Sequence, residues 1–217
     1  MRILLFSVLL VVLGQAHAEE AYTGELLERD GLYYKPFQTK PFSGLRRLWY
    51  ENGQLKIEAN YKDGKLEGVA RLWWKSGQLQ SEITVKNGKQ EGLSRLWHEN
   101  GKLKIEANYK DGKPEGLWRE WDENGQLMSE ETYKDDLREG LWRTWHENGQ
   151  LKEEVTYKNG KREGLWRMWH ENGQLKHEAN YKDGKLEGLG RGWDKNGQLV
   201  NEWCWSNGEE VDMSNCR

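Results

Sequence analysis

Histidine side chains are the groups in this sequence best suited to bind a metal ion. Beyond the first eighteen residues there are four of them, His98, His146, His170 and His177. If His146 and His170 lie two strands apart in a sheet, about 9–10 Å separates them, which is too far to share one Zn²⁺ at bonds of about 2 Å. His170 and His177 could be diagonal neighbours, but two ligands without a third make a weak site. We therefore expect no metal and no cofactor.

The sequence contains none of the common motifs of catalysis. There is no Gly-x-Ser-x-Gly, His-Glu-x-x-His, Walker loop or Cys-x-x-Cys. The 36 acidic residues are spread evenly along the chain, as expected for partners of Arg and Lys. We expect no catalytic residues and a protein that is not an enzyme. A formal net charge of -3 also argues against a basic nucleic-acid binder, so we expect no nucleic-acid partner.

These residues sit in a repeat of fixed length. A motif of the form Gly-Leu-x-Arg-x-Trp recurs every 24 residues, starting at Gly44, Gly68, Gly92, Gly116, Gly140, Gly164 and Gly188. Numbered from that glycine, the copies share Gly at position 1, Arg at 4, Trp at 6, Gly at 10, Leu at 12 and Glu at 15. A fixed period of this length indicates a repeat architecture.

Two turn signals divide each repeat into two short strands. Asn-Gly occupies positions 9–10, as in Asn148-Gly149, and Asp-Gly or Asn-Gly occupies positions 20–21, as in Asp63-Gly64. Both pairs favour the two-residue type I′ turn, which needs positive φ at both residues. We expect an all-β fold, an elongated array of antiparallel β-hairpins that forms a long meander.

Two-residue turns would fix the register of the hairpins. Positions that sum to 19 then face each other across the first turn, so Arg119 faces Glu130 and Arg143 faces Glu154. Opposite charges facing each other contribute about 0.2–1 kcal/mol a pair. We expect these pairs to be structural.

The same register divides the side chains between two faces. The regular face carries positions 2, 4, 6, 13, 15 and 17, which in the fifth repeat include Leu141, Arg143, Trp145 and Glu154. The variable face carries positions 3, 5, 7, 12, 14, 16 and 18, which there include Trp142, His146, Leu151 and Tyr157. The tryptophans of position 6 are expected to be structural; they are Trp49, Trp73, Trp97, Trp121, Trp145, Trp169 and Trp193.

Position 3 is where the repeats differ most. It is small or charged in the first three repeats, then becomes Trp118, Trp142 and Trp166 in repeats four to six. One interpretation is packing, within a sheet that curls on itself or against a second subunit. The other is an aromatic platform that binds a partner, with His146 and His170 beside it. We predict partner binding by these five residues.

The ends of the chain differ from the array. Residues 1–18 combine Arg2, an apolar run and Ala16-His17-Ala18, and we expect a signal peptide cleaved after Ala18. Residues 19–43 are expected to form an N-terminal cap, residues 44–210 the seven repeats, and residues 211–217 a tail. Cys204 and Cys216 are the only cysteines. In an exported protein they predict a disulfide, with two free thiols as the alternative.

The repeat unit, Gly140 to Glu163, resembles the bacterial variant of the MORN repeat. The stretch from Arg29 to Gly44 is similar to the degenerate opening unit of such proteins. The resemblance implies a twisted single-layer sheet and interaction with proteins or membranes rather than catalysis. Some relatives are described as YwqK-family antitoxins of toxin–antitoxin systems.

We therefore expect an exported, periplasmic or secreted protein that acts as a protein-interaction module or scaffold in the cell envelope. Its protein partner is unknown, and homo-oligomers are possible. The alternatives are an envelope surface protein that binds lipid or glycan, and an antitoxin-like protein. Binding to a membrane surface is possible but not expected, because the net charge is negative.

Overall fold

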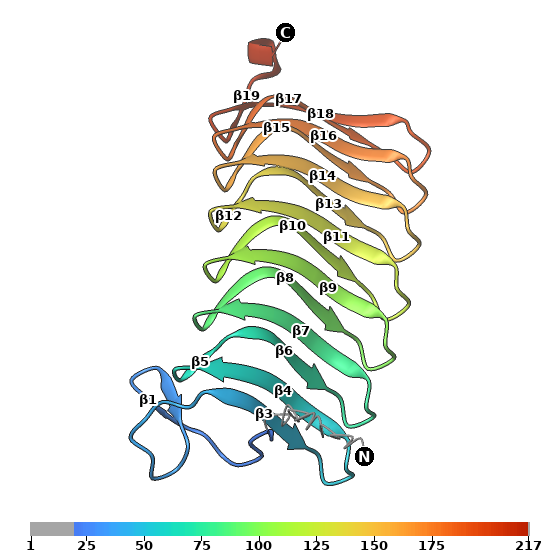
Figure 1. The fold of residues 1–217 in the computed structure, drawn as a ribbon. Helices are drawn as coiled ribbons and strands as arrows, with labels where there is room; N and C mark the ends of the chain where they lie inside the picture. The colour runs from blue at the N-terminus through green and yellow to red at the C-terminus, as the bar shows by residue number, and fades with distance from the viewer. Residues whose placement is uncertain (1–19, 217) are drawn as a thin grey trace, which may run out of the picture.

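The computed structural model describes residues 20–216, which form short antiparallel strands in one long array (Figure 1). The predicted all-β array of hairpins is confirmed. The predicted signal peptide, residues 1–18, lies outside the described part of the chain. Within residues 20–216 no helix has the length and apolar character needed to cross a bilayer.

A small sheet of β1 (Leu27–Arg29) and β2 (Leu32–Tyr34) precedes the array, and a 3₁₀ turn, η1 (Met213–Cys216), follows it. The first half of the array comprises β3 (Gly44–Trp49), β4 (Leu55–Lys62), β5 (Lys65–Leu66), β6 (Gly68–Trp73), β7 (Leu79–Lys86), β8 (Lys89–Trp97), β9 (Leu103–Lys110) and β10 (Lys113–Trp121). The second half comprises β11 (Leu127–Lys134), β12 (Leu137–Arg138), β13 (Gly140–Trp145), β14 (Leu151–Lys158), β15 (Lys161–Trp169), β16 (Leu175–Lys182), β17 (Lys185–Trp193), β18 (Leu199–Ser206) and β19 (Glu209–Val211). Strands pair with their neighbours along the chain, so β3 and β19 lie at opposite ends of an open sheet (Figure 1).

The second turn of each repeat is the two-residue turn that the sequence predicts. Asp63 and Gly64 have φ of 49° and 79°, which is the type I′ geometry. The fourth repeat has Asp135 and Asp136 at this turn, and both still adopt positive φ, 52° and 71°. The short polar side chain of Asp tolerates this conformation better than most residues do.

The first turn is a three-residue loop, so the prediction of a type I′ turn here was wrong. The Gly53 amide donates to the Tyr50 carbonyl at 2.9 Å, and the Tyr50 amide donates to the Gln54 carbonyl at 2.8 Å. Gly53 has a φ of 82°, whereas Asn52 is not among the residues with positive φ. Asn52 instead accepts a hydrogen bond from the Gln54 amide at 3.2 Å. A type I turn followed by a glycine bulge suits an Asn-Gly pair as well as type I′ does.

A bulge beside this loop restores the predicted register further along the strands. Trp121 pairs with Leu127 instead of with position 13, but Arg119 faces Glu130 as the sequence predicts. Leu at position 12 was assigned to the variable face. Because facing residues share a face, the structure places it opposite the position-6 Trp on the regular face.

A second bulge explains the glycine at position 1. Between β14 and β15, Tyr157 faces Arg162 while Val155 faces Trp166, so β15 carries extra residues at its centre. Gly164 lies in this bulge with a φ of 76°, and nothing lies within 4 Å of the place that its Cβ would take. Positive φ, rather than lack of space, therefore requires glycine here.

The two bulges leave one continuous row of alternating charges across the sheet. Arg143 faces Glu154 within its repeat and Glu130 of the preceding repeat. Its Nε lies 2.8 Å from the Glu154 carboxylate. The row runs from Arg47 to Glu202, and each interior member lies between two opposite charges.

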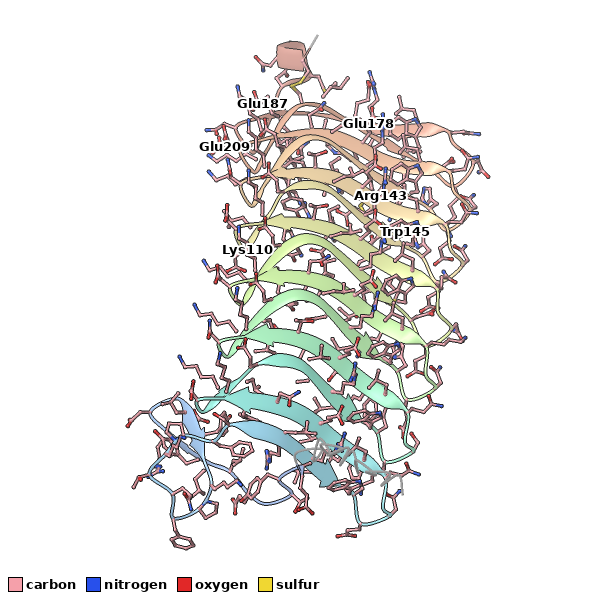
Figure 2. All side chains as sticks on the ribbon, in the orientation of Figure 1. Lys110, Arg143, Trp145, Glu178, Glu187 and Glu209 are labelled. Atoms are coloured by element: carbon pink, nitrogen blue, oxygen red, sulfur yellow. A yellow bond between two sulfur atoms is a disulfide. The ribbon has the colours of Figure 1, made fainter. Side chains whose placement is uncertain are left out.

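Side chains at both edges also fasten each repeat to the next. At the second-turn edge, the Asn159 amide donates to the Glu139 carboxylate at 2.8 Å. At the first-turn edge, Asn148 Nδ2 donates to the Glu171 carbonyl at 2.6 Å. Figure 2 shows Lys110 at the second-turn edge and Trp145 toward the other. Equivalent bonds recur along the array and fix the position of each turn relative to the turn of the next repeat.

Both ends of the array have their own structures. At the N-terminal end, the Tyr22 amide donates to the Leu45 carbonyl at 2.8 Å and the Arg47 amide donates to the Tyr22 carbonyl at 3.0 Å, which covers the outer edge of β3. At the C-terminal end, the predicted disulfide joins Cys204 to Cys216. Cover of the kind that Tyr22 gives β3 prevents uncontrolled strand pairing.

Candidate interaction surface

The variable face holds most of the buried side chains. Positions 3 and 16 form its central row, which is buried at Ala59, Ala70, Ser94, Ala107, Val155 and Ala179. The strands are arched in Figure 1, and side chains inside an arch converge and shield one another. Small residues occupy most of the buried positions of this row.

At the first two repeats the N-terminal segment provides this cover. Phe42 is buried against Ala59 and Ala70, and Tyr22 and Tyr33 pack against the same cluster. The small side chains of Ala59 and Ala70 thus accommodate side chains from residues 20–43. From the fourth repeat on, the array covers its own variable face with large side chains.

Trp118, in the fourth repeat, is the first of the large side chains by which the array covers its own variable face. Its ring lies between Tyr109 and Tyr133, with ring centres 6.1 Å away on each side. The Tyr133 hydroxyl donates to the Glu131 carboxylate at 2.7 Å. Burial and then that carboxylate raise the pKa of Tyr133, so its hydroxyl remains protonated and able to donate.

Arg138 connects the fourth repeat to the fifth. Its Nε donates to Glu131 at 2.9 Å, and its guanidinium lies 5.5 Å from the Trp142 ring and 5.4 Å from the Tyr157 ring. Burial lowers the pKa of Arg138, but its hydrogen bonds to Tyr133 and Glu131 outweigh this and raise it, so the charge is retained. Cation–π contacts of this kind orient both aromatic rings.

Arg162 repeats the arrangement one repeat later. Its Nε lies 3.3 Å from the Tyr157 hydroxyl, and Nη1 donates to the Tyr181 hydroxyl at 3.0 Å. The Trp166 indole N–H donates to Glu153 at 2.7 Å, and the Arg162 guanidinium lies 3.6 Å from the same carboxylate. Aromatic, basic and acidic side chains thus alternate without a gap.

His177 extends this surface toward the last repeat. Its ring stacks on Trp166 with centres 6.3 Å apart, and it lies 5.9 Å from Trp203. Burial, then the charges of Lys176 and His170, lower the pKa of His177. The neutral imidazole is therefore favoured at neutral pH.

The three predicted platform tryptophans lie in this one continuous surface, and all are half-buried. The Trp142 indole N–H is buried without a hydrogen-bond partner in the described structure. The register had placed positions 14, 16 and 18 on the variable face, but partner binding was not predicted for the residues there, which are Tyr109, Glu131, Tyr133, Glu153, Tyr157, His177, Tyr181 and Trp203. Sequence reasoning missed Arg138 and Arg162 altogether. Position 23 held a usable signal, since it is Arg only in repeats four and five, at Arg138 and Arg162.

His146 and His170 have partners in their own chain. Their Nε2 atoms lie 2.9 Å from the carbonyls of Trp169 and Trp193 in the next repeat. A carbonyl oxygen only accepts, so each Nε2 carries the proton. Tyr50 makes the equivalent bond to Trp73 at 2.8 Å, so position 7 has a structural role in several repeats. Partner binding by the two histidines stays a prediction.

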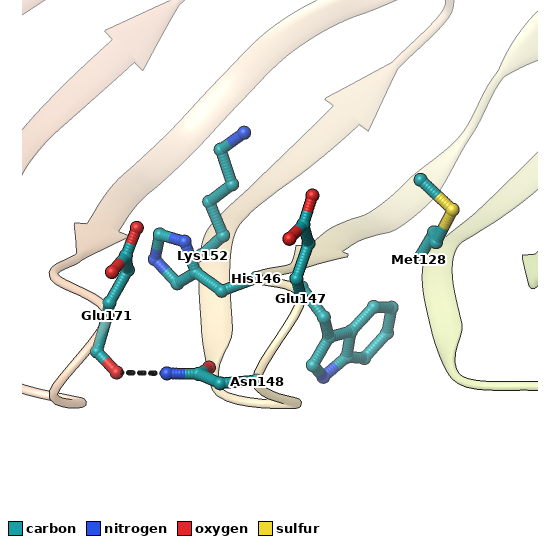
Figure 3. A pocket seen from close by; sticks show the side chains of 7 residues that line it. Met128, His146, Glu147, Asn148, Lys152 and Glu171 are labelled. Carbon is teal, nitrogen blue, oxygen red and sulfur yellow. Dashed lines mark hydrogen bonds between the residues drawn. The ribbon is translucent and has the colours of Figure 1, made fainter. Parts of the chain in front are cut away.

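Hollows open between successive first turns. One is lined by Trp145, His146 and Lys152, with Met128 and Glu171 at its sides (Figure 3). It is open to solvent and mixed in charge. Within residues 20–216 no group of three His, Cys, Asp or Glu side chains could hold a metal ion.

The segments that match a known protein family coincide with the repeats. The MORN repeat variant model matches six segments of the chain, residues 43–63, 66–87, 90–111, 114–135, 138–159 and 162–183. The seventh repeat falls outside these segments, yet it has the same register, with Arg191 facing Glu202. No curated protein matches the chain. The family segments cover more than half of the sequence, and the chain belongs to the MORN repeat variant family.

Proposed function

We propose that this chain is an exported, non-enzymatic repeat protein that binds a protein partner in the cell envelope. The contact surface is the variable face of repeats four to six. The observation that carries the proposal is the unbroken series of aromatic and arginine side chains from Trp118 to Trp166, all half-buried except Tyr157, which is buried. MORN repeats suggest interaction with proteins or membrane lipids.

The composition and rigidity of this surface suit protein binding. Trp, Tyr and Arg are enriched among residues that dominate interface energies. Here Arg138 and Arg162 are held in place by tyrosine hydroxyls and carboxylates, and Trp166 by Glu153. Side chains fixed before binding lose little conformational entropy when a partner docks.

Two features support a location outside the bacterial cytoplasm. The Cys204–Cys216 disulfide suits an oxidising compartment. The leader-like residues before Ala18 would direct the chain there. A cytosolic antitoxin role fits these two features less well.

The groups that could perform chemistry have structural partners, which supports a non-enzymatic role. The position-15 glutamates bind the arginine row, as Glu154 binds Arg143. His146 and His170 bind backbone carbonyls. None of these groups faces a second one in an arrangement for proton transfer.

A membrane surface is the second candidate, and one observation favours it. Lysines flank the second turns in facing pairs, such as Lys110 with Lys113 and Lys182 with Lys185. Repeated along one edge, they would attract anionic headgroups. Position-24 glutamates at the same edge, such as Glu187 in Figure 2, offset part of that charge.

Site-specific photo-crosslinking in envelope fractions tests the proposal. A photo-reactive residue in place of Trp142 should crosslink to a defined protein, whereas one in place of Trp145, on the regular face of the same strand, should not. Vesicles rich in anionic lipid and isolated cell-wall sacculi are included as separate arms. Co-sedimentation with either, together with no protein crosslink from position 142, would contradict a protein-binding role.

A further inference from the structure

The C-terminal edge of the array is only partly paired. β18 faces β17 along most of its length, but β19 covers it only from Cys204 to Ser206. Among residues 20–216, no strand pairs with the outer side of Leu199–Trp203. Leu199 and Val200 are 51% and 55% exposed, unusually high for apolar strand residues in this chain.

In the interior of the array, the following strand covers the part of this stretch that corresponds to Asn201–Trp203. In β14, Glu153, Glu154 and Val155 face three residues of β15. After β19 the chain turns away into η1, and the disulfide ties it to Cys204. One strand segment is therefore missing beside β18.

The backbone groups of Glu202 face this open side. In the first repeat, the Asn60 carbonyl accepts from the Glu67 amide across the second turn, so Asn60 points toward the following strand. Cys204 occupies the equivalent position in the seventh repeat. Because successive residues of a strand point their amides to opposite sides, Glu202 has the same orientation as Cys204.

The charge of Glu202 is also only half matched. Interior glutamates of the row face an arginine on each side, as Glu154 faces Arg143 and Arg167. Glu202 faces only Arg191, at 3.2 Å, compared with 2.8 Å for the Arg143–Glu154 pair. A basic side chain on an added strand would complete its surroundings.

We propose that the Leu199–Trp203 edge of β18 binds an extended segment of a partner protein by antiparallel strand addition, with Arg or Lys opposite Glu202. The segment would take the place of positions 3 to 6 of a further repeat. A second copy of this chain is disfavoured as occupant. Its complementary edge, β3 with Arg47, is already covered by Tyr22. This site is separate from the variable face and does not depend on its role.

The chain supplies its own probe for this site. A peptide copying residues 164–171 contains Arg167, which faces Glu154 inside the array. Titrated into the isotope-labelled, oxidised chain, it should bind saturably and shift the amide signals of Leu199–Trp203. Glu202→Arg should weaken binding by about tenfold, and the peptide carrying Arg167→Glu should then bind this variant better than it binds the original chain.

Two controls and one substitute variant accompany the test. Glu209→Arg changes the charge of the same end equally and should leave affinity within about twofold, since Glu209 lies outside the row. A peptide methylated on the arginine amide nitrogen should bind poorly because it lacks a strand hydrogen bond. If Glu202→Arg unfolds, as judged by circular dichroism, Glu202→Gln replaces it.

The proposal is overturned if both peptides bind each variant equally, or if the shifts map away from β18. It is also overturned if sedimentation shows a dimer that Glu202→Arg dissociates, because a second copy would then occupy this edge.

Discussion

At the scale of single residues, the structure depends on the Arg–Glu pairs that the 24-residue repeat places opposite each other. The arginine of position 4 is about two-fifths exposed and its glutamate about one-quarter, as for Arg143 and Glu154 at 38% and 24%. Isolated pairs with such exposure contribute little. In a continuous row each interior charge interacts with two opposite charges, so the row contributes more to stability than the same number of isolated pairs.

Arg143→Glu should lower the free energy of unfolding by about 1–2 kcal/mol, because it places a carboxylate beside both Glu130 and Glu154. Adding Glu154→Arg should recover part of that loss but not all, since the introduced guanidinium would lie beside Arg167. Chemical denaturation of the single and double variants gives the coupling energy. Zero coupling would show that the charges act independently of the register.

His177 should make stability depend on pH. Its pKa is lowered in the folded state, first by burial, so the unfolded chain binds the proton more readily. The contribution of His177 to the free energy of unfolding is therefore at its maximum above the usual histidine pKa of 6.5, and it declines as the pH falls below that value. His177→Asn should therefore flatten the pH profile of unfolding between about pH 7 and pH 5. If the free energy of unfolding of the variant had the same slope against pH, His177 would not be the cause of the pH dependence.

At the scale of elements, turns and bulges determine what could be predicted from the sequence. The period and the two strands followed from spacing alone. The Arg–Glu register was predicted from a two-residue first turn, and it holds because the bulge beside the three-residue loop compensates for the extra residue. The first turn did not follow from spacing, because Asn-Gly suits two turn types. The three-residue loop forms whichever residue precedes it, as at Trp74, Asp122 and His146. The same limit hid Arg138 and Arg162, whose places on the variable face depend on a bulge.

Asp136→Gly should stabilise the protein by about 0.5–1 kcal/mol. Asp136 has a φ of 71° where all six other repeats have glycine, and left-handed backbone strains a residue with a Cβ. Gly160→Asp is the matched control, with a φ of 76° at the same turn of the next repeat. It should destabilise by a similar amount, and thermal unfolding measures both. Destabilisation by Asp136→Gly would show that the Asp side chain stabilises this turn.

At the scale of the whole molecule, an open array stabilises each repeat chiefly through its neighbours. The outer strands at its two ends are covered to different extents. Residues 20–43 cover the edge of β3, whereas the disulfide holds a tail that leaves part of β18 open. Local changes at one end should therefore spread only through adjacent strands.

Reduction of Cys204–Cys216 should loosen the C-terminal end alone. The closed loop spans a sequence separation of 12 residues, for which chain entropy gives a stabilisation of at most about 3 kcal/mol. Hydrogen exchange should rise in β18, β19 and η1 and stay constant from β6 to β15. Faster exchange throughout the array would mean that the repeats unfold as one unit.

The most direct measurement of the interaction role is the affinity of the crosslinked partner for two tryptophan variants. Trp142→Ala changes the variable face and Trp145→Ala changes the regular face of the same strand, β13. Trp142→Ala should weaken binding by about thirtyfold or more, while Trp145→Ala should leave it nearly unchanged, with both variants folded by circular dichroism. Equal affinities, or a loss that follows thermal stability in both variants, would contradict a binding surface on the variable face.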